Sequence, residues 1–309
     1  MANRKRQTRE ARPPLKPFDF NLVRARLDGL LFNVNRGLEK RLNVARSHAD
    51  KVSAHELLLM MAFIRLAANS YNALRYLVAE EPQDANRKPH FVLVIPPVNR
   101  QLLDLLFTLV YMFDDFRPRS RAYRRATWRE LSEESHKVST AHRNDPEWKP
   151  HFKNIKVAKD AVIAGAGITP EEQKRPSMIP YWKHPEELSE EKTPSRPFLR
   201  WLFKWLYADT SAQAHLSANG LFMTAPFILL DLLGENRKLA ERDEYHSYRF
   251  HQFSRTILIV LAVATEIDSH FKLGCENDAS YLWGIIQGYV IEGKNMYDQR
   301  YDALLNRNR

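Results

Sequence analysis

Glycine and cysteine are scarce in this chain of 309 residues, and both shortages limit the classes of fold that the sequence can form. The 10 glycines offer few of the tight turns that a strand-rich fold needs every few residues. The single cysteine, Cys275, excludes an intramolecular disulfide and a cysteine-rich metal cluster, which predicts a cytoplasmic protein. Hydrophobic residues still make up 44% of the chain, enough for a large core. The sequence therefore predicts an all-α multi-helix bundle.

Long apolar runs and familiar catalytic motifs are also missing. The most apolar runs, 102–113, 221–233 and 257–264, are shorter than the roughly 18–20 residues that span a bilayer, so we expect buried core helices and no membrane span. There is no phosphate-binding glycine loop, Gly-x-Ser-x-Gly elbow, His-Glu-x-x-His or zinc-ligand spacing. Acid-x-x-His pairs such as Glu133 with His136 are flanked by charged residues and are typical of solvated turns. We therefore expect no cofactor and no metal.

The net charge of +10 is concentrated in two short segments. Residues 1–17 carry six Lys or Arg and one Glu, and residues 117–129 carry six Arg and no acid. The remainder of the chain is close to neutral. Two basic segments on a neutral body predict a phosphate-rich or otherwise acidic partner.

The apolar spacing predicts a basic arm at 1–17, disordered when alone, followed by one helical domain at 18–309. Ser53 and Glu56 have the spacing of a capping box and predict that the second helix begins there. Frequent prolines in 143–195 predict a surface excursion with one short helix at 157–164. The remaining helices are expected at 20–46, 53–81, 98–113, 119–142, 198–207, 210–233, 241–271 and 278–306.

The arginine-rich helix carries the first candidate site. At about 100° per residue, five of its side chains fall on one face: Arg121, Arg124, Arg125, Trp128 and Arg129. Arginines neutralise phosphates and an indole among them can stack on a base, which favours phosphate or nucleic-acid binding. The alternative is a solvated face whose arginines pair with nearby carboxylates.

Arg129 and His136 lie on this same face, seven residues apart. On one phosphodiester, the histidine would act as general acid or base and the arginine would stabilise the developing charge, especially across a dimer. The Arg-x6-His spacing resembles the motif of HEPN-domain proteins, helical bundles that include metal-independent ribonucleases of bacterial defence systems. The residue after Arg129 is Glu130, where that family usually has an uncharged polar residue or Asp.

A second pattern joins two other helices. Tyr207, Ser211 and His215 follow one another at every fourth position, and Arg100 precedes Asp104 by one turn on an earlier apolar helix. This combination resembles an uncharacterised family of bacterial helical proteins, which implies a fold but no reaction. The residue chemistry predicts a buried polar ladder between helices. A small-molecule pocket beside Arg100 and Asp104 is the alternative.

The leading functional hypothesis is an RNA- or phosphate-associated helical protein, with a HEPN-like metal-independent ribonuclease as its sharpest form. A homodimer would bring two Arg129–His136 pairs together. The alternative is a non-catalytic scaffold whose basic segments dock an acidic protein partner. The sequence leaves open whether the chain is an enzyme.

Overall fold

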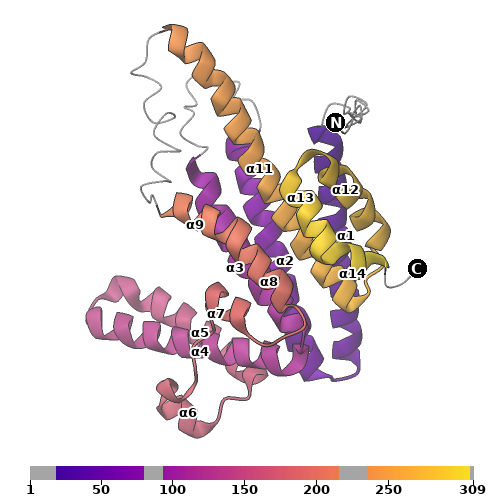
Figure 1. The fold of residues 1–309 in the computed structure, drawn as a ribbon. Coiled ribbons are helices and arrows are strands. Elements are labelled where there is room, and N and C mark those ends of the chain that lie inside the picture. Colours follow the sequence, from indigo (N-terminus) through magenta and orange to yellow (C-terminus); the bar gives the residue numbers. More distant parts are fainter. Residues whose placement is uncertain (1–18, 80–92, 216–234, 307–309) are drawn as a thin grey trace, which may run out of the picture.

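The computed structural model describes residues 19–79, 93–215 and 235–306, and all regular structure in these ranges is helical (Figure 1). The prediction of an all-α multi-helix bundle is confirmed. The predicted basic arm at 1–17 lies outside the described residues, as do 216–233 of the helix predicted at 210–233.

The core of the bundle surrounds one long helix, α11 (Glu235–Phe271). It packs against α1 (Phe20–Ser47), α2 (Lys51–Leu74), α3 (Ile95–Phe113) and α12 (Glu276–Tyr289). Every side chain of its apolar run at 257–264 is buried, because neighbouring helices surround this part of α11. The helix therefore sets the axis around which the bundle is built.

Two described helices are long and apolar enough to cross a membrane, judged by length and composition alone: Ser53–Leu77 and Tyr248–Phe271. Charged or polar residues, Arg65 among them, lie within both helices. Each uninterrupted apolar run in the sequence is therefore shorter than the helix that contains it. In Tyr248–Phe271, 89% of the most apolar window is buried inside the bundle, the pattern of a core helix, against 44% in Ser53–Leu77.

Among the described helices, three contain a π-helical turn, which inserts an extra residue into the helix. The turn η5 (Phe203–Tyr207) joins α8 (Arg196–Leu202) to α9 (Ala208–Ala214). The turn η1 (Arg75–Ala79) extends α2, and η7 (Tyr297–Tyr301) joins α13 (Ile291–Met296) to α14 (Asp302–Asn306). Such turns are frequent at functional sites, and η5 ends at Tyr207 of the predicted ladder.

A helical hairpin projects sideways from one end of the bundle (Figure 1). It consists of α4 (Phe116–Ala141) and α5 (Lys149–Ala166), joined through η3 (Pro146–Trp148). The expected short helix at 157–164 is thus much longer, because Pro150 lies in the first turn of α5, where its missing N–H costs nothing. The rest of the proline-rich segment forms short elements: α6 (Pro170–Lys174), η4 (Pro176–Met178) and α7 (Pro185–Glu190).

The start of α2 differs from the predicted capping box. Asp50 is the N-cap, and its carboxylate accepts a hydrogen bond from the backbone N–H of Ser53. Glu56 instead lies buried and accepts a hydrogen bond from Ser120 of α4, at 3.3 Å. The aspartate takes the capping role, which leaves the glutamate free to link the bundle to the hairpin.

A buried network around Arg300 holds four segments together. Its guanidinium donates to both carboxylate oxygens of Glu266 and, from Nη1, to Ser195 Oγ at 2.8 Å. The hydroxyl and backbone N–H of Ser195 donate to Asp114, at 2.7 and 3.1 Å. Burial alone would lower the pKa of Arg300, but the charge and hydrogen bonds of Glu266 raise it above its ordinary value. The network connects η7, which contains Arg300, to α11, to the start of α8 and to the end of α3.

Arg300→Met should lower the free energy of unfolding by about 3–5 kcal/mol, because it leaves the buried carboxylate of Glu266 without its cation. Denaturant unfolding followed by tryptophan fluorescence measures the change. Lys294→Met is the control, since it removes only the exposed pair with Asp298 and should cost less than about 1 kcal/mol. Equal losses in the two variants would contradict a special role for the buried network.

His270 lies among aromatic rings at the same end of the bundle. It stacks on Phe113 at 4.2 Å between ring centroids and contacts Phe116 and Phe271. Burial lowers the pKa of His270 below its ordinary value of 6.5, although Glu266 opposes the shift. The unfolded chain therefore takes up a proton more readily than the folded protein.

Because the pKa of His270 is lower in the folded protein than its ordinary value of 6.5, protonation of His270 should lower the free energy of unfolding as the pH falls below about 6.5. His270→Phe keeps the ring stack and removes the titration, so its stability should fall less between about pH 7 and about pH 5 than that of the native protein. Denaturant midpoints across this range measure the difference. His136→Phe is the control, since this histidine is also exposed but has no ring contact with any residue that the structure describes, and it should change the curve less than His270→Phe does.

Candidate functional site

The arginine-rich face of α4 is covered around Trp128 and Arg124, which corrects the expectation that the whole face is open to a partner; Arg121 is still exposed. Trp128 is 2% exposed and packs with Ala166, Ile168 and Ile179 in a small second core. Arg124 is also buried. This face is covered because α5 and the segment after it pack against α4, a long-range contact that the spacing of the arginines does not reveal.

Two arginines of this face bind the C-terminal end of α5. Arg121 Nε donates to the carbonyl of Ala166 at 3.2 Å, and Arg125 Nη1 donates to the carbonyl of Gly167 at 3.1 Å. The last carbonyls of a helix lack intrahelical partners and carry partial negative charge. Arg125 also pairs with Glu172. These contacts stabilise the hairpin itself.

Arg124 interacts electrostatically with Glu56 of α2, at the base of the hairpin. Burial raises the pKa of Glu56, and Arg124 is the strongest influence that opposes the rise. Burial likewise lowers the pKa of Arg124, and Glu56 opposes that shift. Each group thus compensates the cost of burying the other. The pair fastens the hairpin to the bundle.

Arg129 and His136 do not form a joint site. Arg129 Nε donates to Glu133 at 2.8 Å, Nη1 donates to the carbonyl of Ile179 at 2.6 Å, and the guanidinium lies 3.5 Å from the ring centre of Tyr181. Its partners hold it against the segment that covers α4. His136 is exposed two turns further along. The arrangement gives Arg129 a structural role and leaves the histidine by itself.

The polar ladder is brought together as predicted for four of its five residues. Tyr207 donates its hydroxyl to Asp104 at 3.0 Å, and Arg100 Nη1 donates to Ser211 at 3.3 Å. The guanidinium of Arg100 lies 3.6 Å from the ring centre of Tyr207 and forms an ion pair with Asp104 at 3.8 Å. Burial raises the pKa of Asp104, against the charges of Arg100 and His184.

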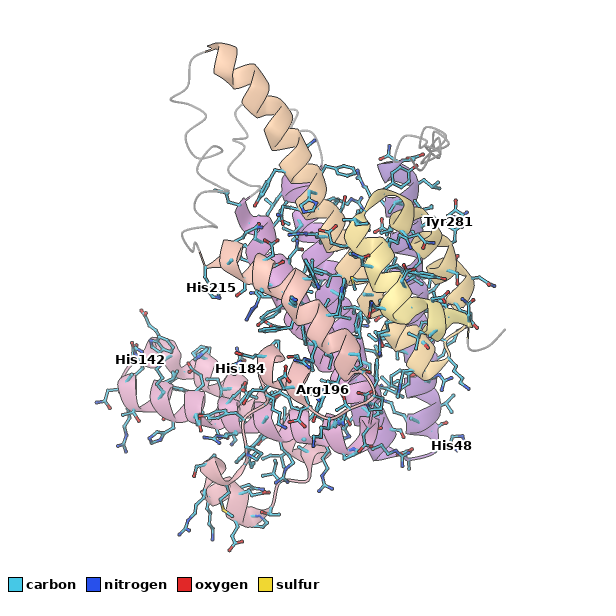
Figure 2. All side chains as sticks on the ribbon, viewed as in Figure 1. His48, His142, His184, Arg196, His215 and Tyr281 are labelled. Atoms are coloured by element: carbon cyan, nitrogen blue, oxygen red, sulfur yellow. The ribbon has the colours of Figure 1, made fainter. Side chains whose placement is uncertain are left out.

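His215 is not part of this ladder. The helix α9 ends at Ala214, and His215 is its exposed C-cap, near the end of the described segment (Figure 2). A histidine at the predicted fourth-residue spacing would need another helical turn to remain over α3. The ladder therefore consists of Arg100, Asp104, Tyr207 and Ser211.

The hairpin also carries exposed positive charge on α5, beside the exposed Arg117, Arg121 and Lys137 of α4, and the spacing of the arginines did not indicate it. Lys149, Lys153 and Lys156 are exposed and occupy positions i, i+4 and i+7, which share one face of a helix. Lys137 and Arg143 are exposed near the same end of the hairpin. The lysine spacing was visible in the sequence once α5 was known to be a helix from Lys149 onward.

Aromatic rings lie beside these lysines. The rings of His142 and Trp148 stack at 3.9 Å between centroids, and His151 meets Trp148 edge to face at 5.2 Å. Figure 2 shows His142 at the far end of the hairpin, away from the bundle. We call Lys137, Arg143, Lys149, Lys153, Lys156 and this ring stack the hairpin tip.

Within the described ranges, no three His, Cys, Asp or Glu side chains are grouped so that they could hold a metal ion. Cys275 is buried, and burial raises the pKa of its thiol to about 12. A reactive thiolate is therefore not available there.

Comparisons with models of protein families, with curated proteins and with solved structures found no match. The resemblance to HEPN-domain proteins is not confirmed. The fold and its surfaces define an all-α bundle with a basic projecting hairpin.

The covered face of α4 predicts a large effect of truncating its tryptophan. Trp128→Ala should lower the free energy of unfolding by about 3–5 kcal/mol, because it opens a cavity in the second core. Trp205, which is 59% exposed, provides the matched control, and Trp205→Ala should cost about 0.5 kcal/mol or less. Denaturant unfolding measures both. A Trp128→Ala variant as stable as the control would place Trp128 on the surface.

Proposed function

We propose that this chain is a non-catalytic polyanion-binding protein that holds single-stranded RNA against the hairpin tip. The observation that carries the proposal is the row of exposed lysines at 149, 153 and 156 on a hairpin that projects from the bundle. Sequence-independent binding of single strands combines such flexible cations with ring surfaces on which bases stack. The His142–Trp148 stack offers that ring surface.

The division of charge within the hairpin supports this assignment. Residues 116–166 contain twelve Lys or Arg and six Asp or Glu, so the hairpin has a net charge of +6. Arg121, Arg125 and Arg129 use their guanidinium groups inside the molecule. In the part of the chain that the structure describes, the side chains of Lys149, Lys153 and Lys156 form no salt bridge. They are available to a partner.

A binding role fits the chemistry better than the ribonuclease hypothesis. Cleavage of RNA needs Arg129 free to stabilise a phosphorane next to His136. The three contacts of Arg129 would all have to be broken first. Binding needs no such rearrangement.

Replacing the three lysines Lys149, Lys153 and Lys156 by Ala should weaken binding of fluorescent single-stranded RNA and reduce its salt dependence. The slope of log K against log salt should fall by about 2, since each phosphate contact contributes about 0.7. Fluorescence anisotropy at several salt concentrations, without divalent metal, gives both quantities.

The matched control replaces three exposed lysines outside the hairpin, Lys40, Lys192 and Lys204, by Ala. It has the same net charge and should bind RNA as the native protein does. Equal weakening in both triple variants would mean general charge attraction and would contradict a site at the hairpin tip. Metal-free cleavage that is lost in His136→Ala would replace the proposal with the ribonuclease hypothesis.

A further inference from the structure

A pocket of about 440 Å³ lies where the hairpin meets the bundle. Its volume is within the range of small-molecule sites. Helices α2, α3 and α4 and the segment 182–185 all contribute to it. Figure 2 shows His184, one of its residues, between the hairpin and the bundle. Its lining includes three aromatic residues, Phe63, Tyr123 and Trp182, and three charged ones, Arg100, Asp104 and Glu130.

Aromatic rings form one wall of this pocket. Phe63 and Tyr123 meet edge to face at 5.5 Å, and Tyr123 and Trp182 meet edge to face at 5.1 Å. Trp182 Nε1 donates to Thr108 at 3.2 Å, which fixes the orientation of the indole. Ring faces held in this way attract cations and apolar chains.

Two cations, Arg100 and Lys183, and two carboxylates, Asp104 and Glu130, line the pocket, and Glu130 is the one of these four without an ionic partner in the described part of the chain. Arg100 is paired with Asp104, and Lys183 is paired with Glu191. Glu130 has no hydrogen bond or salt bridge to any residue that the structure describes, and it lies on α4 one turn after Thr127 of the same pocket. The side chain of Asp104 is still 44% exposed. A cation can therefore reach both carboxylates.

We infer that this pocket binds a small aliphatic amine in its protonated form. Its ammonium group would contact Glu130 and the ring faces of Tyr123 and Trp182, and its methylene chain would pack along the aromatic wall. A second ammonium, as in a polyamine, would lie toward Asp104. This site is separate from the hairpin tip and does not depend on the proposed RNA binding.

The electrostatics of the wall agree with this assignment. Burial raises the pKa of Tyr123, and the charge of Glu130 raises it further. Glu130 thus acts directly on the ring that would contact the ligand. The rest of the molecule does not favour polyamines, because the chain has a net charge of +10 and repels cations in general.

Binding of an amine would join two parts of the molecule. Glu130 and Tyr123 belong to the hairpin, whereas Phe63 and Asp104 belong to the bundle. A ligand that contacts all four adds an attachment beside the Arg124–Glu56 pair. It would stabilise the folded state in proportion to its concentration above the dissociation constant.

Calorimetric titration and thermal unfolding with spermidine and putrescine test the inference. Spermidine should bind the native protein and raise its Tm. Glu130→Gln should raise the dissociation constant about tenfold or more, because one charge-assisted contact is lost. Glu134→Gln is the matched control: it removes an exposed carboxylate from the same helix outside the pocket and should bind spermidine as the native protein does.

Four results would overturn the inference. The first is no binding of spermidine or putrescine to the native protein. The second is an equal loss in Glu130→Gln and Glu134→Gln, which would indicate general surface charge. The third is a higher Tm with phosphate or acetate in place of the amines. The fourth comes from a titration with N-acetyl-lysine amide, which carries the ammonium group of a protein lysine. Binding of this probe in preference to spermidine would assign the pocket to a lysine of a protein partner and overturn the small-molecule assignment.

Discussion

The architecture depends on one buried ion pair between Arg300 and Glu266. The carboxylate is 2% exposed, so it is tolerable only while the guanidinium holds both of its oxygens. The same guanidinium reaches Ser195, which in turn binds Asp114 at the end of α3. Elements far apart in the chain must therefore dock together or leave a charge buried alone. Such a requirement favours one arrangement of the helices over the many that apolar packing alone would allow.

The hairpin shows how one composition can serve two purposes. Its inner arginines satisfy the end of α5 and the buried Glu56, so they are part of the packing. Its exposed lysines at 149, 153 and 156 form no salt bridge with any residue that the structure describes, and they remain available to a partner. The ladder of Arg100, Asp104, Tyr207 and Ser211 links α3 to η5 and α9, and two of its residues, Arg100 and Asp104, also line the pocket at the base of the hairpin. Basic residues thus contribute to packing where they are enclosed and remain available for recognition where they are exposed.

The sequence predicted the helices more accurately than the sites. The long run of α11 and the arginine-rich α4 follow from the spacing of apolar residues, which is local information. The pairing of Tyr207 and Ser211 with α3 could also be predicted, because fourth-residue spacing places them on one face. The burial of Trp128 and Arg124 could not, since it depends on α5, and Pro150, one of the prolines that predict a surface excursion, lies in the first turn of that helix. Arg300 carried no local signal, because its partners lie 34 and 105 residues away.

The close contact at Gly165 has a consequence for how this protein can change over evolution. A β-carbon at this position would clash with Nη1 of Arg124 and would lie 2.7 Å from the ring of His55. Because Arg124 is buried and interacts with Glu56, it has little room to move aside. Residue 165 is therefore coupled to both neighbours: a larger side chain at 165 is tolerated only when residues 124 and 55 leave room for it. Related chains are expected to vary at these three positions together.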